Sequence, residues 1–484
     1  MPSVILLLIL PLFGAVLCAL LPARHADKCA IGATGGMLLS LVWLLLARPG
    51  GNWQSLPLTW RWLQGSFREG LFGFLLDPLA LLLLLVVVVL GFLVVLYATA
   101  YLGAGNREHA DVTGKSRHHA WLLLFITAMI GVALSPNLLQ LYLFWEMTTL
   151  CSWALISHYR NPESLRAGFK ALLMTFSGGL FFALGLVLLY VHTGSFAFDA
   201  LSDLAPRMRL WVFLSFAVAA WAKSAQFPFF TWLPDAMAAP TTVSMYLHAA
   251  AMVKAGVFLM VRLALANPGL PWTAGLVVAV LAVVTMLVAL WLFFFQDDLK
   301  KLLAYSTIAH LSYVFLGVGV AIMGSRLGAY AGAMHIMNHS VGKGLLFLSV
   351  GVLSYTAGTR RISELAGVAR HSPLAAIAFM VGMLAILGVP PFSGFWSKFY
   401  LMVAALKLGG AAGWLLLIPF ALEIAVAFAW FLHIGHKVFF GPASGHAAKA
   451  GALPGVMAAA LIILMLLTLL APWAAMQLMG AMGL

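Results

Sequence analysis

Long apolar stretches alternate with short polar connections along almost the whole of this 484-residue chain. Stretches of about 20 apolar residues match the thickness of the hydrocarbon core of a bilayer. The pattern therefore predicts an all-α integral membrane protein with about fourteen transmembrane helices. We expect these helices near residues 3–22, 29–47, 78–103, 119–135, 137–157, 164–192, 209–237, 241–266, 271–296, 300–322, 326–356, 373–406, 410–436 and 453–482. Trp53–Phe74 is too polar and aromatic to span, which favours a short interfacial hairpin.

Two of these spans carry prolines and a lysine where an unbroken helix would be expected, and they lie five spans apart. A proline inside a span frees backbone groups that only neighbouring protein or a polar cavity can satisfy. Repeated broken helices of this kind are typical of inverted repeats, so we predict two inverted five-helix units. The residues at the breaks are Pro228 and Pro234 with Lys223, and Pro390 and Pro391 with Lys398.

The predicted repeats divide the chain into four parts. Residues 1–103 hold helices 1–3, residues 104–266 the first repeat, residues 267–440 the second repeat and residues 441–484 the last helix. The first apolar run has no basic residues ahead of it, which favours a retained span over a cleaved signal peptide.

Composition agrees with a membrane protein, since 63% of the residues are hydrophobic and 8% are charged, against roughly 25% charged in soluble domains. The net charge of +13 comes from scattered residues, so it does not indicate a nucleic-acid partner. Of the 27 lysines and arginines, 14 lie in connections on one side, 7 on the other and the rest within spans. The positive-inside rule then places both termini on the periplasmic side of a bacterial cytoplasmic membrane.

Glu146 lies near the middle of the fifth span, and Lys223 lies deep in the seventh. A charge at this depth costs several kcal/mol and usually has a partner or a function. We predict that the two side chains pair and act as a protonation switch. The alternatives are a protonated, hydrogen-bonded carboxyl that only packs, and a lysine that snorkels to the membrane surface.

His335, His339 and Lys343 stand at i, i+4 and i+8 in the eleventh span and so share one helical face. Imidazoles in a polar stripe through an apolar segment favour a proton relay. Two histidines at this spacing can also bind zinc, but no acidic or cysteine ligand stands nearby. Histidines that merely form hydrogen bonds between helices remain the third interpretation.

The remaining intramembrane candidates extend this path. Lys254 and His248 belong to the eighth span, with His310 as a secondary member in the tenth. Lys398 follows the second proline break and could face an exit. Glu423 in the thirteenth span is either the partner of Lys398 and terminal acceptor, or purely structural.

No Walker A loop, dinucleotide fingerprint, CxxC motif or haem-attachment sequence occurs in the chain. Its three cysteines lack metal or disulfide spacing, so we expect neither a metal nor a cofactor. Driving energy must then come from an ion gradient or from a partner protein.

The sequence resembles the proton-translocating antiporter-like subunits of complex I, the Mrp cation/proton antiporters and the group 4 hydrogenases. The resemblance covers nearly the whole chain from the third to the thirteenth span. Its specific stretches are LFWEMTTLCSWALIS, WAKSAQFPFFTWLPDAMAAPTTVSMYLHAAAMVKAGV, DLKKLLAYSTIAHLSYV, HIMNHSVGKGLLFL and GVPPFSGFWSKF. Within this superfamily, NREH, CSWALISHYR, GSRLGAY and LSYTAGTRR resemble the component D family of hydrogenase-4.

The resemblance implies a proton-translocating, or Na⁺-translocating, subunit of a respiratory redox complex of the formate hydrogenlyase type. It has no redox centre of its own and is surrounded by other membrane subunits, with peripheral redox subunits acting indirectly. The implied axis comprises Glu146, Lys223, His248, Lys254, His335, His339, Lys343 and Lys398. Alternatives are an Mrp-type antiporter subunit without a redox partner, a complex I pumping subunit and a structural membrane anchor. The long lateral helix of the largest complex I subunit is not expected after the fourteenth span.

Overall fold

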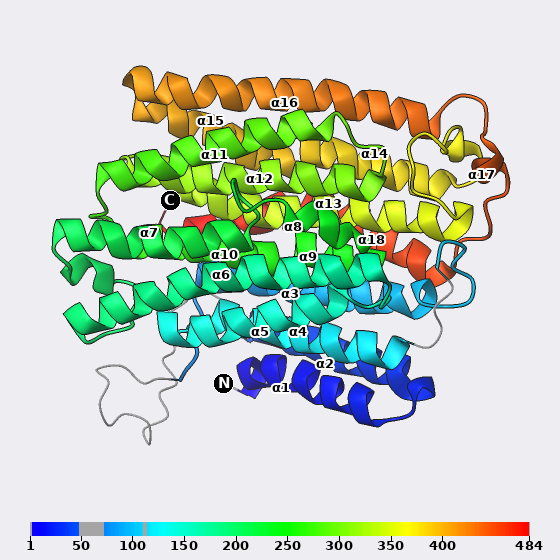
Figure 1. The fold of residues 1–484 in the computed structure, drawn as a ribbon, viewed down its shortest axis with the longest axis horizontal. Helices are drawn as coiled ribbons and strands as arrows, with labels where there is room; N and C mark the ends of the chain where they lie inside the picture. Colours follow the sequence, from blue (N-terminus) through cyan, green and yellow to red (C-terminus); the bar gives the residue numbers. More distant parts are fainter. Residues whose placement is uncertain (1, 48–71, 110–113, 484) are drawn as a thin grey trace.

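The computed structural model describes residues 2–47, 72–109 and 114–483. The interfacial hairpin expected at Trp53–Phe74 lies outside the described residues except for its last three. Helices pack side by side along the longest axis of the molecule, and α1 begins and α18 ends toward the left of the bundle in Figure 1.

The long helices follow the predicted spans closely. Their bounds are α1 (Pro2–Leu20), α2 (Ala26–Leu46), α3 (Pro78–Tyr101), α4 (Lys115–Leu134), α5 (Leu138–Ile156), α6 (Pro162–Thr193), α7 (Pro206–Lys223), α9 (Thr241–Ala249), α10 (Met252–Ala266), α11 (Trp272–Phe293), α12 (Leu299–Ile322), α13 (Leu327–Ala357), α14 (Pro373–Leu387), α15 (Ser393–Leu408), α16 (Gly410–Phe439) and α18 (Gly455–Ala481). Short helices α8 (Trp232–Asp235), η4 (Ala236–Ala238) and α17 (Gly445–Ala448) connect them.

Eleven helical segments in the described part of the chain are long and apolar enough to cross a membrane, with α9 and α10 counted together. Helix α5, which carries Glu146, and the two broken segments α7–η4 and α14–α15 complete the fourteen crossings predicted from the sequence. Because consecutive crossings alternate in direction, units of five crossings run in opposite orientations. The predicted all-helical membrane fold is thus confirmed. Its division into two inverted units and the residue boundaries of the four parts stay predictions.

Both predicted breaks are present and both contain a cis peptide bond before proline. In the first, α7 ends at Lys223 and the chain turns through Phe227–Pro228, while Pro234 lies within α8. In the second, α14 ends at Leu387, Gly388 follows with a left-handed φ of 84°, and Pro390–Pro391 precede α15. Proline lacks the N–H that would continue a helix, so each break ends a helix inside the bundle.

The eighth span is also interrupted, which the sequence did not predict. Helix α9 ends before Ala250, and α10 begins after Ala251, whose φ and ψ of −113° and −117° are not helical. The interruption separates His248 from Lys254. This third interruption is additional to the two predicted breaks, and no proline or glycine marks it in the sequence.

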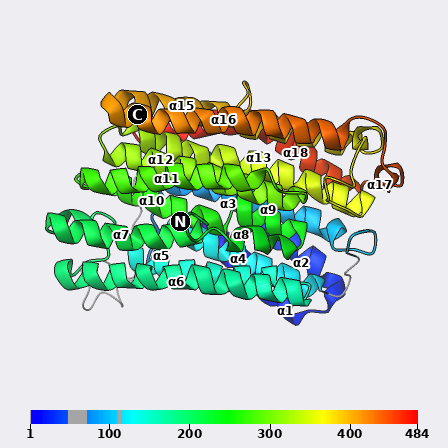
Figure 2. The same ribbon diagram turned by 45° about the horizontal axis from the view of Figure 1, so that its top comes forward.

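The helices differ in how much of their surface is buried within the bundle. The apolar part of helix α13 is completely buried, and α3, α9–α10, α12, α14, α15 and α18 pack against it. The turned view places α12 and α13 between α6 and α16 (Figure 2). Outer helices such as α6 and α16 expose large apolar side chains, as a lipid-facing surface requires. Polar residues on the inner helices consequently have no contact with lipid.

Candidate functional site

The first part of the site joins α5, α6 and α7 around Lys223. The Lys223 side chain is fully buried, and its Nζ donates to the Trp145 carbonyl at 2.8 Å and the Thr149 hydroxyl at 2.5 Å. Glu146 lies on the same helix, one turn before Thr149. Its Oε1 faces Gly179 and has no hydrogen-bond partner among the described residues.

The direct Glu146–Lys223 ion pair expected from the sequence is absent from the described ion pairs, so that expectation was wrong in its geometry. The Lys223 ammonium donates instead to the Thr149 hydroxyl and the Trp145 carbonyl. Both acceptors are within its reach because residues one turn apart on α5 share a face. The ammonium also lies 5.0 Å from the centre of the Trp145 ring. Lys223 therefore lies close to Glu146 but is held by neutral acceptors.

The first break is tied to the second half of the chain by a buried amide. Gln226 Nε2 donates to the Ser224 carbonyl at 2.9 Å, and Ser312 on α12 donates to Gln226 Oε1 at 3.0 Å. These bonds satisfy polar groups that the break would otherwise leave unpaired. They also connect α7 to the helix that carries His310.

The centre of the site is a cluster of one lysine and three histidines. Lys254 Nζ lies 2.6 Å from His339 Nδ1, and His310 Nδ1 lies 3.2 Å from His335 Nε2. The His310 and His339 ring centres are 5.4 Å apart. All four side chains are buried, and the predicted helical face of His335 and His339 is directed at α10 and α12.

The second break completes the site around Lys398. His335 Nδ1 lies 2.8 Å from the Ser397 hydroxyl, and Lys398 Nζ donates to the Leu387 carbonyl at 3.2 Å. Leu387 is the last residue of α14, so its carbonyl is one that the break leaves free. The break thus supplies an acceptor for the buried ammonium.

Glu423 lies near Lys398 but does not pair with it directly, so the direct contact, one of the expected alternatives, is not present. Tyr313 stands between them: its hydroxyl donates to the Glu423 carboxylate, and its ring centre lies 5.3 Å from Lys398 Nζ. An aromatic face attracts a cation, so Tyr313 contacts both charges at once.

Two predicted members are buried in the bundle without joining this chain of contacts. Lys343 Nζ donates to the Leu303 carbonyl on α12 at 3.1 Å. The His248 ring packs on Phe347 with centres 4.8 Å apart, and neither ring nitrogen has a hydrogen-bond partner within the described ranges. Neither the Lys343 nor the His248 side chain contacts another titratable group of the site through a hydrogen bond given for the described residues.

Sequence reasoning missed the neutral polar residues that link the charges. Thr149, Tyr313 and Ser397 each contact a predicted charge or histidine, and Gln226 bridges the two halves. Their spacing was a usable signal, since Thr149 follows Glu146 by three positions and Tyr313 follows His310 by three. Within the described ranges, no group of three or more histidine, cysteine, aspartate or glutamate side chains is arranged to hold a metal ion.

Together these residues form a polar axis, which we define as the series of titratable groups from the partly buried Glu146 on α5 to the buried Glu423 on α16. A membrane bundle of inverted units with charges at its helix breaks is the architecture of antiporter-like membrane subunits. Residues 135–423 match the family described as "NADH:quinone oxidoreductase/Mrp antiporter, TM", and the chain belongs to that family. Residues 62–109 match the N-terminal region of complex I chain 5. The chain is accordingly an integral multi-pass membrane protein.

Relatives of known name come from two kinds of complex. Chloroplastic NAD(P)H-quinone oxidoreductase subunit 5 of Anthoceros angustus is 34% identical over 74% of this chain and 50% of its own length. Na⁺/H⁺ antiporter subunit A1 of Staphylococcus aureus is 38% identical over 68% of this chain and 42% of its own. This chain therefore spans about half the length of the curated relatives it matches.

Two solved structures share the fold. A chain of the Mrp complex from Dietzia sp. DQ12-45-1b superposes with a TM-score of 0.85 at 29% identity, covering 99% of this chain and 52% of that one. A chain of the archaeal membrane-bound sulfane sulfur reductase gives a TM-score of 0.85 at 23% identity, covering 99% and 98%. The second likeness concerns the fold alone.

Proposed function

We propose that this chain translocates protons or Na⁺ along the polar axis as one membrane subunit of a respiratory redox complex. The observation that carries the proposal is the burial of the Lys223, Lys254, Lys343 and Lys398 side chains inside the helical bundle. Buried cations of this kind cost several kcal/mol in a membrane, so their alignment favours a transport function over packing. The structural anchor is the alternative that this cost disfavours.

Lys223 is the proposed switch. Its ammonium is held by Thr149 and the Trp145 carbonyl, one turn from the unpartnered Glu146 Oε1. A rotation of the lysine side chain would exchange neutral acceptors for a carboxylate, giving two arrangements of different charge distribution. Moving one charge against 100 mV takes about 2.3 kcal/mol, within the range of re-pairing partly buried charges.

Where the ion is a proton, it passes from Lys223 to Lys254, then through the histidine cluster to Lys398. Lys254 contacts His339 directly, and His335 contacts Ser397 beside Lys398. Histidines relay protons because each ring can take a proton at one nitrogen and release it from the other. Tyr313 and Glu423 form the terminal acceptor in this scheme.

The parent complex is proposed to be of the group 4 hydrogenase or formate hydrogenlyase type, with component D as the matching subunit. The supporting observation is the resemblance of NREH and GSRLGAY to that component. An Mrp-type antiporter subunit is the second candidate, favoured by the 38% identity to a named Na⁺/H⁺ antiporter subunit. Purification of the complex separates them, because iron–sulfur partner proteins support the first and small antiporter subunits the second.

The proposed orientation has both termini in the periplasm of a bacterial cytoplasmic membrane. Its support is the distribution of basic residues, since the connections assigned to the cytoplasmic side hold 14 lysines and arginines and those assigned to the other side hold 7. Labelling of single cysteines at Arg24 and Arg207 with an impermeant reagent tests this orientation. Labelling of the Arg24 site from the periplasm would reverse it.

Lys223→Met tests the function, because methionine keeps most of the side-chain volume and removes the charge. We expect the complex to assemble but proton flux across membrane vesicles, driven by a valinomycin-imposed potassium potential, to be abolished. Lys407→Met removes an exposed lysine and serves as the matched control. Unchanged flux in Lys223→Met would support a structural anchor instead.

A further inference from the structure

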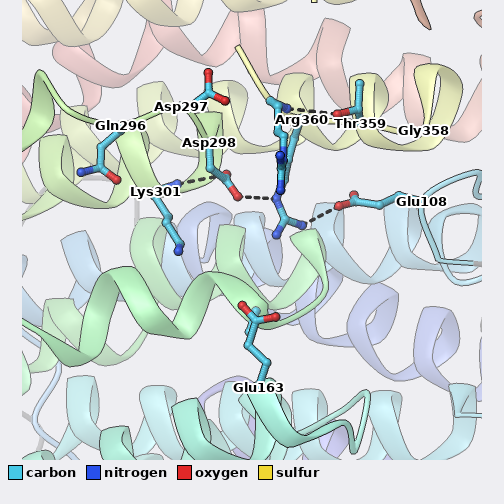
Figure 3. A pocket seen from close by; sticks show the side chains of 11 residues that line it. Glu108, Glu163, Gln296, Asp297, Asp298, Lys301, Gly358, Thr359 and Arg360 are labelled. Carbon is cyan, nitrogen blue, oxygen red and sulfur yellow. Dashed lines mark hydrogen bonds and ion pairs between the residues drawn. The ribbon is translucent and has the colours of Figure 1, made fainter. Parts of the chain in front are cut away.

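A polar vestibule lies at one end of the bundle, where four connections meet. It has a volume of about 620 Å³, and its lining includes Glu108, Glu163, Asp298, Lys301 and Arg360. Figure 3 shows Arg360 between Asp298 and Glu108, with Glu163 directed toward them from α6. All of these residues belong to connections or helix ends on the side proposed to be cytoplasmic.

Glu108 is fixed at the inner end of this vestibule. Arg360 Nη1 donates to Glu108 Oε1 at 2.7 Å, and Arg360 Nε donates to Asp298 Oδ2 at 2.8 Å (Figure 3). Burial alone would lower the pKa of Arg360, but the carboxylates of Asp298 and Glu108 raise it above its ordinary value. Asn106 Oδ1 accepts the backbone N–H of Glu108 at 3.0 Å and so holds the turn.

The second carboxylate oxygen of Glu108 begins a line of hydroxyl groups that leads inward. The Ser354 hydroxyl donates to Glu108 Oε2, and the Tyr101 hydroxyl lies 3.2 Å from Ser354 and 2.9 Å from the Thr241 hydroxyl. Ser354, Tyr101 and Thr241 are all buried. Since Ser354 gives its proton to the carboxylate, Tyr101 must donate to Ser354 and Thr241 to Tyr101.

Thr241 is the first residue of α9, the helix that carries His248. Seven positions separate the two residues, so they share a helical face about 10 Å apart along the axis. Both ring nitrogens of the buried His248 lack a hydrogen-bond partner among the described residues. An imidazole without a partner, about 10 Å beyond the last hydroxyl on the same helical face, is a ready proton acceptor.

We propose that Glu108, Ser354, Tyr101 and Thr241 form the proton uptake wire that leads from the vestibule to His248 on the polar axis. The proposal rests on the proposed function of the axis. In the arrangement seen here the three hydroxyls donate outward, toward Glu108, so inward transfer requires them to turn. A protonated Glu108 no longer needs the hydrogen bond from Ser354, and the hydroxyls rotate so that Ser354 donates to Tyr101 and Tyr101 to Thr241. The carboxyl then gives its proton to Ser354, and each hydroxyl passes one proton to the next. Thr241 releases one proton toward His248 through intervening water, so each proton taken up displaces one proton inward and no hydroxyl gains or loses charge overall.

A neighbouring polar line is the natural competitor for this role. His118 Nε2 lies 3.0 Å from the hydroxyl of Thr242, and its ring packs edge-on against His119, whose Nε2 lies 2.9 Å from the partly exposed Asp27. Thr242 lies on a different face of α9 from His248, because six residues turn a helix by about 240°. This geometry favours Tyr101 over His118 as the route to the axis.

Tyr101→Phe breaks the wire while keeping the ring. Tyr97→Phe is the matched control, since Tyr97 is a buried tyrosine one turn earlier on α3 whose hydroxyl donates only to the Leu348 carbonyl. Proton flux from the vestibule side is measured in vesicles containing the intact complex, under a valinomycin-imposed potassium potential, beside the melting temperature of each variant. We expect about a tenfold lower flux for Tyr101→Phe and a flux near wild type for Tyr97→Phe, with similar melting temperatures.

Each other outcome has a distinct meaning. Wild-type flux in Tyr101→Phe, together with abolished flux in Lys223→Met, overturns the wire and leaves the function standing. An equal loss in Tyr101→Phe and Tyr97→Phe would assign both tyrosines a packing role and also overturn it. Loss of flux in His118→Phe with normal flux in Tyr101→Phe would move the uptake route to the Asp27 side.

Discussion

The hydroxyl of Tyr313 is the most informative single group to remove from the polar axis. Tyr313→Phe keeps the ring that packs against His310, with centres 4.7 Å apart, and against Phe420 at 4.8 Å. It removes only the hydrogen bond that the hydroxyl donates to the buried Glu423 carboxylate. The change therefore tests the linking role of the hydroxyl without opening a cavity.

A hydrogen bond to a charged group contributes about 1.5–3 kcal/mol, and its loss leaves the carboxylate with one acceptor site unsatisfied. Taking about 2 kcal/mol, the ionised form of Glu423 becomes about thirtyfold less populated relative to the protonated form. If Glu423 accepts protons at the end of the axis, proton flux should fall by up to about thirtyfold. Lys398 keeps its contact with the Leu387 carbonyl and with the aromatic face.

The assay is proton flux in vesicles containing the intact complex, followed with a pH-sensitive dye. Tyr97→Phe is again the control, since it removes a buried hydroxyl that contacts no titratable side chain among the described residues. Melting temperatures of the detergent-solubilised variants exclude a loss of folding. A Tyr313→Phe variant that folds and conducts like wild type would refute the assignment of Tyr313 and Glu423 to the axis.

Two further changes test other parts of the structure. In Gly179→Ala the new Cβ would lie 2.1 Å from Glu146 Oε1, so the carboxyl must move, at a cost of about 1–3 kcal/mol. We therefore expect reduced proton flux in an assembled complex. Wild-type flux would count against a role for Glu146 in transport. Burial alone would raise the pKa of Asp77, but Arg262 outweighs it and holds that pKa below its ordinary value. The pair therefore stabilises the fold above about pH 4 and loses this contribution as pH falls through the lowered pKa. Arg262→Met should cost about 3 kcal/mol at pH 7 and less in acid, measured by thermal unfolding; an equal cost at both pH values would contradict the pairing.

The sequence predicted the crossings and the helix breaks because each has a strong local signal. Runs of apolar residues mark the spans, and Pro228 and the Pro390–Pro391 pair mark the breaks. The shared face of His335 and His339 followed from helical periodicity alone. The interruption at Ala250–Ala251 was not predictable in this way, since alanine is the best helix former and its departure from helical geometry depends on tertiary packing.

Partners of the charges were harder to predict than their positions. Opposite charges suggested direct pairs, but spacing along separate helices does not determine which groups touch. A neutral hydroxyl residue nearby can form the hydrogen bond instead, as Thr149 does with Lys223 and Tyr313 does with Glu423. Hydroxyl residues are common in membrane helices, so their presence in the sequence did not single them out.

Lys223 and Glu423 are both contacted by a hydroxyl residue where a direct ion pair was one expectation, and this bears on transport. Each broken helix places a lysine near an acid, and in each case a hydroxyl residue contacts the lysine or the acid in place of a direct ion pair. Coulomb attraction falls with distance, so separated charges bind each other less tightly than a contact pair in the same buried environment. A contact pair inside a membrane bundle would be a deep energy minimum that is costly to break. Neutral spacers therefore keep Lys223 and Lys398 free to change partners, which is the property that repeated turnover of an ion-conducting axis requires.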